Sequence, residues 1–233
     1  MQVIILAGGK GTRLKPYTTV IPKPLVPLGD YPILEIVLKQ LAKNGFRNIT
    51  LAVGHLADLI KAYFGSGNKW DLHISYSYEN EPLGTVGPLK LINELEENFL
   101  VMNSDDLTDI NYKEFFDFHL QHKAPVTIAI YKKEVKIDLG TVSVDMDNRL
   151  KSYIEKPTYH FNVSMGIYAF NKKALKYIPR NTYFDFPDLI KKLLAEKIKV
   201  MSYPHEGFWL DIGRPEDYEK AAENFQQILT QLL

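Results

Sequence analysis

The sequence predicts an α/β fold built on a mixed, mainly parallel sheet that is covered by helices. Short β-rich runs alternate along the chain with segments of helical periodicity, as expected for strand–helix–strand units. The 233 residues are 45% hydrophobic and 24% charged, an ordinary globular composition. This length favours one large domain, residues 1–233, over two.

The first half of the chain contains the clearest elements. Val3–Ala7 is a compact apolar run that ends at a glycine pair, which is typical of a buried strand. Tyr31–Asn44 has apolar residues at helical spacing and is followed by Gly45, a helix stop. The other elements expected up to residue 122 are strands at Asn48–Val53, His73–Tyr78 and Phe99–Met102, and helices at Ala57–Phe64, Leu89–Leu95 and Tyr112–His122.

The second half is more irregular, which suggests strands inserted between the sheet and the helices. An aromatic-rich stretch, Tyr153–Phe161, lacks a basic surround and is expected to be core and pocket wall. The histidines His119 and His122 are expected on a polar helix face. The predicted elements are strands at Val126–Tyr131, Thr141–Val144, Ser164–Phe170 and Lys199–Tyr203, a turn at Asp147-Asn148, and one terminal helix from Pro215 to Leu232.

Composition excludes several classes of function. Lys and Arg total 28 and Asp and Glu total 28, so a basic protein that coats a nucleic acid polymer is excluded. No cysteine is present, so there is no disulfide and no thiolate metal site. No apolar run approaches the ~18 residues of a membrane span. We expect a cytoplasmic protein with no membrane partner, and a helical C-terminus compatible with a homodimer.

The most informative segment is LAGGKGTRLKP, Leu6–Pro16, in which a strand runs into a loop with three glycines. Glycine lets backbone N–H groups approach an anion closely. A dinucleotide fingerprint would need glycine at position 14, where Leu14 stands. A Walker loop around Gly9-Lys10 would need glycine at Ile4 and Ser or Thr at Gly11. On its own, the loop is equally consistent with phosphate binding of another type and with a glycine-rich turn whose cations are solvated.

A second unusual segment, Ile21–Leu25, holds Lys23 between two prolines. Proline fixes its own φ and restricts the residue before it, so the backbone at Lys23 is stiff. A preorganised positive charge requires this kind of frame.

The stretch LAGGKGTRLKPYTTVIPKPLVPLGDYPILE, Leu6–Glu35, closely resembles the signature of the sugar-1-phosphate nucleotidyltransferases. Further matches cover nearly the whole chain: EPLGT at Glu81–Thr85, Asn103–Asp105, EKP at Glu155–Pro157 and WLDIGRPEDY at Trp209–Tyr218. The resemblance implies a Rossmann-like sheet with inserted sugar-binding strands. It also implies a nucleotide-binding half at 1–110 and a sugar-binding half with C-terminal helices at 111–233.

Members of this family join an NTP and a sugar 1-phosphate to give an NDP-sugar and pyrophosphate. The sugar phosphate attacks the α-phosphorus in line, so positioning and charge neutralisation supply the rate. By position in the motifs, Arg13 and Lys23 are the expected catalytic residues and Asp105 and Asp211 the expected Mg²⁺ ligands. The expected nucleotide-binding residues are Leu6, Ala7, Gly8, Gly9, Gly11, Thr12, Glu79, Pro82, Gly84 and Thr85, and the expected sugar-binding residues are Asn103, Gly140, Glu155, Lys156 and Ser164.

Two departures from the family pattern bear on specificity. Where relatives have Asn-Gly-Asp, this chain has Ser104 in place of the glycine, which adds a side chain, and Asp106 follows the motif and adds a carboxylate near the expected metal. Ser164 replaces an asparagine that often contacts the sugar. The Asn-Ser-Asp-Asp departure at residues 103–106 leaves a second class open, a nucleotide-sugar sensor that binds without turnover.

The nucleobase is expected to lie near Glu79. A carboxylate only accepts hydrogen bonds, and guanine offers two adjacent donors where uracil and thymine offer one. EPLGT also resembles the guanylyltransferase branch, of the mannose- or heptose-1-phosphate type. The alternatives are a uridylyl- or cytidylyltransferase that acts on another sugar phosphate or on a non-sugar phosphate or phosphonate.

Overall fold

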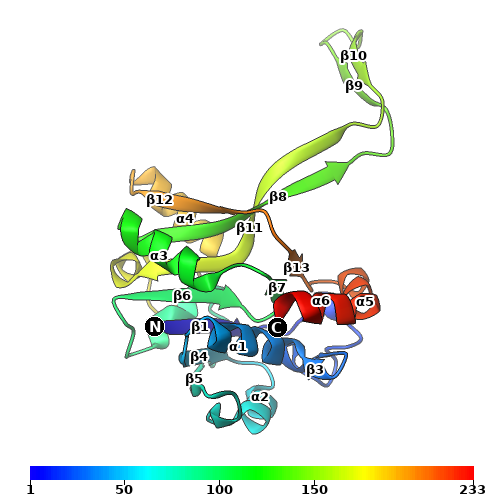
Figure 1. Ribbon diagram of the computed structural model, residues 1–233. Helices are drawn as coiled ribbons and strands as arrows, with labels where there is room; N and C mark the ends of the chain where they lie inside the picture. Colours follow the sequence, from blue (N-terminus) through cyan, green and yellow to red (C-terminus); the bar gives the residue numbers. More distant parts are fainter.

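A seven-stranded sheet in the order β12-β8-β11-β6-β1-β4-β5 forms the centre of the molecule in the computed structural model, which describes residues 1–233 (Figure 1). Strands β6, β1, β4 and β5 run parallel, β11 runs antiparallel to both neighbours, and β12 is parallel to β8. The α/β prediction with a mixed sheet is confirmed. The strands span Gln2–Ala7 (β1), Asn48–Val53 (β4), His73–Tyr78 (β5), Asn98–Asn103 (β6), Val126–Lys136 (β8), Thr158–Asn171 (β11) and Val200–His205 (β12).

Helices cover both faces of this sheet, and the sheet separates the hydrophobic core into two clusters. Side chains alternate along a strand, so Val3 and Ile5 of β1 join the larger cluster and Ile4 joins the smaller one. Among the α-helices only α4 contributes to the smaller cluster, which also contains Leu89 and Ala174 from 3₁₀ segments. The helices are α1 (Ile33–Lys43), α2 (Ala57–Phe64), α3 (Tyr112–His122), α4 (Phe186–Ala195), α5 (Pro215–Glu223) and α6 (Phe225–Leu232).

Three two-stranded sheets complete the fold. The pair β7 (Asp106–Thr108) and β13 (Trp209–Asp211) is antiparallel, as are β9 (Thr141–Val144) with β10 (Leu150–Ile154) and β2 (Pro27–Leu28) with β3 (Tyr31–Pro32). No helix combines the length and the apolar character needed to cross a bilayer.

The helix predicted at Leu89–Leu95 is wrong. The structure has one 3₁₀ segment, Gly87–Leu91, and then an irregular stretch. There the backbone of Glu94 and Glu96 hydrogen-bonds the side chain of Gln2 instead of helical partners, at 3.0 and 2.9 Å. The Gln2 side chain of β1 thus provides hydrogen-bond partners that a helix would have supplied from its own backbone.

The single terminal helix predicted from Pro215 to Leu232 is two helices that meet at Asn224. The break turns Phe225 toward the body, where its ring lies against Gly29 so closely that a Cβ there would come within 2.1 Å. Helix α4 was not expected, although Asp185 and Asp188 form a capping box at its start.

The expectations for His119 and for Tyr153–Phe161 are also wrong. In both cases burial depends on packing between segments distant in sequence. His119 is buried, 1% exposed, and its Nδ1 lies 2.8 Å from Thr127 Oγ1. The aromatic stretch Tyr153–Phe161 is not core: Tyr153 and Phe161 are 60% and 54% exposed.

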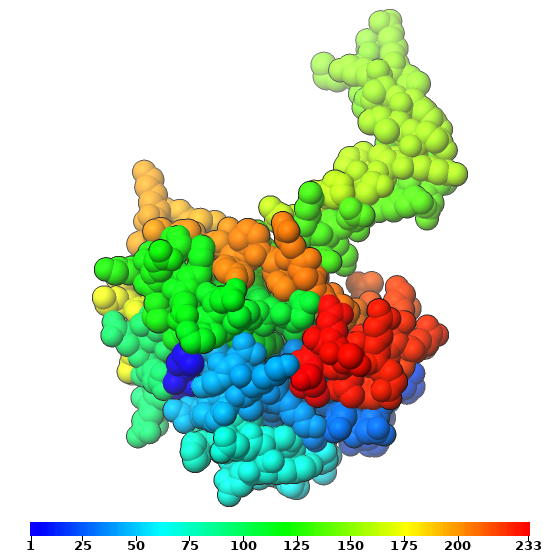
Figure 2. Space-filling model, in the orientation of Figure 1, coloured from blue at the N-terminus to red at the C-terminus, as the bar shows by residue number.

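The reason for that exposure is a projecting arm, Lys132–Val163. Beyond residue 131, strands β8 and β11 pair only with each other and leave the sheet, and β9 and β10 form the far end. The arm rises clear of the body in the ribbon view and in the space-filling view (Figures 1 and 2). Strands β8 and β11 are therefore much longer than the predicted Val126–Tyr131 and Ser164–Phe170.

Candidate active site

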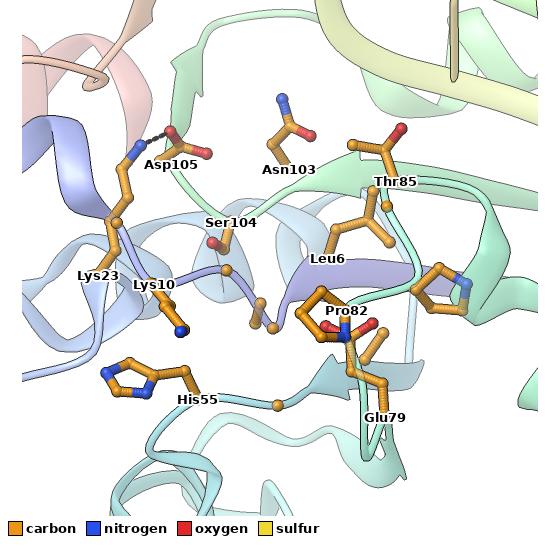
Figure 3. A pocket seen from close by; sticks show the side chains of 18 of the residues that line it. Leu6, Lys10, Lys23, His55, Glu79, Pro82, Thr85, Asn103, Ser104 and Asp105 are labelled. Carbon is orange, nitrogen blue, oxygen red and sulfur yellow. Dashed lines mark hydrogen bonds and ion pairs between the residues drawn. The ribbon is translucent and has the colours of Figure 1, made fainter. Parts of the chain in front are cut away.

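A cavity of about 960 Å³ opens at the carboxyl ends of β1, β4 and β6 (Figure 3). Ligands of open α/β sheets bind at this edge. The cavity wall is mostly polar, as binding of a charged ligand requires. It is formed by the loops at 6–13, 52–55, 79–85, 103–105, 183–185 and 211–213, together with Lys23, Pro24 and Pro88.

The glycine-rich loop forms one wall of this cavity. Gly11 has φ of +60°, a conformation that strains other residues, and it begins a 3₁₀ turn, Thr12–Leu14. Thr18 Oγ1 donates to the carbonyl of Gly11 at 2.7 Å, and the buried side chain of Leu14 anchors the turn in the core. The loop is thus held open on the cavity side with its backbone N–H groups and Arg13 available to an anion.

Lys23 contacts Asp105 across the cavity floor (Figure 3). Both side chains are nearly buried, 13% and 11% exposed. Pro24 follows inside the 3₁₀ segment Lys23–Leu25, so the predicted proline frame is present. The charge of Lys23 is therefore held in place before any ligand arrives.

Asp105 and Asp211 come together through the small β7–β13 sheet. That sheet pairs Asp106 with Asp211, and the N–H of Ile212 donates to the carbonyl of Asp105 at 3.2 Å. Burial and the neighbouring Asp105 carboxylate raise the pKa of Asp211 to about 6. A carboxylate whose ionisation is opposed by burial and by a neighbouring carboxylate favours a cation beside it.

These two carboxylates fit Mg²⁺, which binds proteins through one or two carboxylates and completes its shell with water and substrate phosphates. No group of three or more His, Asp or Glu side chains is arranged as a self-sufficient metal cage. The donor set thus suits a cation that shares its ligands with a bound nucleotide.

Asp106, one of the two departures noted in the sequence, turns away from the cavity. It is 1% exposed; its Oδ2 accepts from Asn103 Nδ2 at 3.1 Å and its Oδ1 from Trp209 Nε1 at 3.3 Å. Burial, Asp105 and Asp211 raise its pKa well above the usual range. Asp106 therefore supports the floor from below, while Ser104 lies in the cavity wall.

Glu79 lies at the opposite end of the cavity, beside Gly8. A Cβ on Gly8 would come within 2.2 Å of Glu79 Oε1, so only glycine fits there without displacing the carboxylate. Its Oε2 accepts from the N–H of Leu83 at 3.1 Å, and burial raises its pKa. The carboxylate is fixed and faces the cavity.

The loop after Glu79 is fixed by helix α4. The N–H of Thr85 donates to Asp185 Oδ1 at 2.9 Å, and Thr85 Oγ1 accepts from the N–H of Phe186. Sequence reasoning missed Asp185 and its neighbour Tyr183 as cavity residues. The capping box at Asp185 and Asp188 marks a helix start, but nothing local shows that this start faces residue 85.

The cavity brings together most of the predicted site residues and leaves four outside. Gly140, Glu155 and Lys156 lie on the arm, and Ser164 lies at its base, where its hydroxyl donates to Tyr168. Those in the cavity are Leu6, Ala7, Gly8, Gly9, Gly11, Thr12, Arg13, Lys23, Glu79, Pro82, Gly84, Thr85, Asn103, Asp105 and Asp211.

The fold and this cavity define an α/β domain in which a glycine-rich loop and a pair of carboxylates line one cavity. The chain belongs to the nucleotidyl transferase family, whose model matches residues 2–228. The expected family is confirmed.

Curated proteins of similar sequence include a guanylyltransferase subunit. It is 36% identical over 230 residues to mannose-1-phosphate guanylyltransferase catalytic subunit beta of Danio rerio, an alignment that covers 94% of this chain and 62% of that protein. The chain thus spans about three fifths of the length of the curated relatives it matches.

Two solved structures share the fold. HddC from Yersinia pseudotuberculosis, complexed with GMP-PN, is 30% identical with a TM-score of 0.71, over 96% of this chain and 99% of that one. A putative glucose-1-phosphate thymidylyltransferase from Bacillus anthracis, in complex with a sucrose, has a TM-score of 0.75 at 21% identity, over 96% and 94%. The second likeness concerns the fold alone.

Proposed function

We propose that this chain is a cytoplasmic, Mg²⁺-dependent sugar-1-phosphate nucleotidyltransferase that uses GTP, of the mannose- or heptose-1-phosphate type. The observation that carries the proposal is Lys23, fixed in the cavity floor against Asp105 and close to Asp211. A preorganised cation beside a metal-binding carboxylate pair is what in-line attack on an α-phosphorus needs.

In the proposed reaction, the glycine-rich loop and Arg13 hold the β- and γ-phosphates, which depart as pyrophosphate. Lys23 neutralises charge that develops on the α-phosphate. Asp105 and Asp211 hold the metal, whose contribution when bound is to screen the phosphate oxygens. The sugar phosphate oxygen forms the new bond to the α-phosphorus as the bond to the bridging oxygen breaks, so no protein nucleophile takes part.

Guanine recognition is assigned to Glu79. Its fixed carboxylate would accept from guanine N1–H and N2–H₂. The guanylyltransferase names of the relatives support this choice, as does the GMP-PN bound to HddC. A Glu79→Gln variant is expected to lose GTP preference over the other nucleotides.

The residues 1–110 are proposed to hold the nucleotide and 111–233 to hold the sugar, with Asn103 at the boundary. Gly140, Glu155, Lys156 and Ser164 remain proposed sugar contacts. These four residues lie on the arm or at its base, outside the cavity lining. They can contact a sugar bound in a cavity, of this chain or of another copy, only if the arm lies over that cavity.

The test is pyrophosphate release with Mg²⁺, across the five common NTPs and hexose, hexosamine and heptose 1-phosphates. Activity with GTP alone supports the proposal. Activity with UTP or CTP would retain the enzyme class and contradict the role of Glu79. Nucleotide binding without turnover on the whole panel would favour the non-catalytic sensor. Asp106 gives that alternative little support, because it points away from the cavity.

A further inference from the structure

The far end of the arm, Lys132–Val163, carries an apolar face that nothing in the chain covers. The β9–β10 register sets Val142 opposite Tyr153 and Val144 opposite Leu150, so these four side chains share one side of the hairpin. We call this surface the tip face. Each of the four residues is more than half exposed, from 53% for Val144 to 62% for Leu150.

The opposite side of the same hairpin is mostly polar and carries one apolar residue, Ile154. Ser143 and Ser152 face each other there, and their hydroxyls lie 2.6 Å apart. Asp145 closes the turn by accepting from the N–H groups of Asp147 and Arg149, both at 2.9 Å. The hairpin is thus amphipathic and its turn is closed by hydrogen bonds. An isolated two-stranded hairpin is nevertheless only marginally stable in water. An amphipathic hairpin of this kind needs a surface to cover its apolar side.

The base of the arm repeats the pattern. The β8–β11 register sets Val135 opposite Tyr159, and Phe161 lies on the same side two residues further along. These three residues are 40%, 39% and 54% exposed, while Glu134 and His160 occupy the other side. Both segments of the arm therefore present an apolar strip to solvent.

The amount of exposed apolar surface fits a stable protein interface. Ten large apolar residues of the arm are exposed, namely Val135, Leu139, Val142, Val144, Met146, Leu150, Tyr153, Ile154, Tyr159 and Phe161. The seven of these on the apolar sides of the tip and the base, which exclude Leu139, Met146 and Ile154, present on the order of several hundred Å², a patch size that marks an interaction site. A stable interface takes about 800 Å² from each partner.

The charges of the arm point to a second copy of this chain as the occupant. The arm carries six cationic and five anionic side chains, and the whole chain has zero formal net charge. A two-fold interface brings the same patch together with itself, so a strongly charged patch would repel its copy. A nearly neutral patch with an apolar centre is self-complementary, and it offers little attraction to nucleic acid or to anionic lipid.

We propose that the arm is a dimerisation element, and that two copies pair through their tip faces about a two-fold axis. Pairing would fix where Gly140, Glu155 and Lys156 lie, since all three are on the arm; this consequence rests on the proposed function, whereas the pairing itself does not. The arm is then an assembly surface that also carries substrate-binding residues into place.

Sedimentation velocity on the full chain, with a matched pair of variants, tests the proposal. The wild type is expected at twice its chain mass of 26.8 kDa at micromolar concentration. Val142→Asp puts a charge in the tip face and is expected to give a monomer. Ser143→Asp puts the same charge on the next residue, on the opposite side of the hairpin, and is expected to leave the dimer unchanged.

A second measurement covers the case in which Val142→Asp disturbs the hairpin itself. The chain has no cysteine, so a single introduced thiol is unique. Val144→Cys is expected to cross-link two chains with a short bis-maleimide, and Ser143→Cys is expected to cross-link at least tenfold less.

A wild-type monomer at all concentrations, an assembly larger than a dimer, or equal effects of the two members of either pair would overturn the proposal. Sedimentation of a monomer with anionic vesicles would also overturn it. None of these readouts uses enzymatic activity, so failure of the proposed function would not affect them.

Discussion

The body and the arm use strands of the same two elements, β8 and β11, in opposite ways. In the body, these strands lie between neighbours on both sides, and Ala129 and Ala169 are fully buried. Past residue 131 they lose those neighbours, and Lys132 to Lys136 are all exposed. The contrast teaches that a strand's burial depends on what packs against it, and that the arm keeps its strand pairing without acquiring a core.

The largest expected difference between the two regions is the effect on kcat of removing a lysine side chain. Lys23→Ala is expected to lower kcat by at least about 10³-fold, since a preorganised charge on the transition state is lost. Lys132→Ala removes the same charge from the exposed arm and is expected to change kcat less than twofold. Pyrophosphate release gives kcat, and circular dichroism checks that both variants are folded. Equal losses in the two variants would mean that overall charge, and not the position of Lys23, governs turnover.

Apolar truncation is expected to separate the regions by stability. Ile5→Ala in β1 leaves a cavity in the larger core and is expected to cost about 2–5 kcal/mol. Val142→Ala in the tip face is expected to change the unfolding free energy of the monomer by less than about 0.5 kcal/mol. Urea titrations at low protein concentration measure both. A cost for Val142→Ala near that of Ile5→Ala would show that the arm packs into the body.

A buried and an exposed histidine are expected to differ in the pH dependence of stability. Burial lowers the pKa of His119 to about 4, against a usual value of 6.5, so the unfolded chain binds a proton more readily between these pH values. The stability that neutral His119 contributes is full above pH 6.5 and is lost as pH falls toward 4. Between pH 7 and pH 5 the loss is about 2 kcal/mol.

His119→Gln is expected to remove this part of the pH dependence while keeping a partner for Thr127. His160→Gln, on the exposed polar side of the arm, is the control and is expected to leave the slope unchanged. Thermal unfolding at pH 5, 6 and 7 provides the comparison. An unchanged slope in His119→Gln would mean that other groups, such as Asp211, dominate in this range.

The smallest expected effect compares two glycines with the same crowding. A Cβ would come within 2.2 Å of Glu79 at Gly8 and within 2.1 Å of the Tyr153 hydroxyl at Gly140. Glu79 is held by Leu83 and faces the cavity, so Gly8→Ala is expected to raise the KM for the NTP about tenfold, or 1.4 kcal/mol. Tyr153 is exposed and can rotate, so Gly140→Ala is expected to leave that KM and the Tm unchanged. A raised KM for the NTP in Gly140→Ala would contradict the placement of the arm outside the nucleotide end.

The sequence predicted the body well because local patterns determine its elements. The ranges Asn48–Val53, Ala57–Phe64, His73–Tyr78 and Tyr112–His122 agree with the structure to the residue, since each combines a clear hydrophobic period with a glycine or polar stop. Leu89–Leu95 also has a helical period, but a side chain distant in sequence, Gln2, takes the backbone hydrogen bonds. Competition of that kind has no local signal.

The site was predicted through motif resemblance, and the structure adds its long-range pairing. Asp105 and Asp211 meet because β7 pairs with β13, and three-residue strands are too short to be recognised by pattern. The orientation of Asp106 depends on Asn103 and Trp209, which no spacing rule connects. The projection of the arm could not be predicted, because apolar and polar residues alternate along its strands as they do in half-buried strands. In the structure only solvent lies against the apolar side.

The closure of the C-terminal helices on the N-terminal half has a consequence for synthesis on the ribosome. Phe225 packs on Gly29, Tyr218 donates to the carbonyl of Pro27 at 2.8 Å, and Asp211 completes the carboxylate pair begun by Asp105. A nascent chain that has emerged up to β12 can pair all seven strands of the main sheet while still lacking Asp211. The emerging polypeptide can therefore complete its main sheet before the two carboxylates of the cavity are brought together.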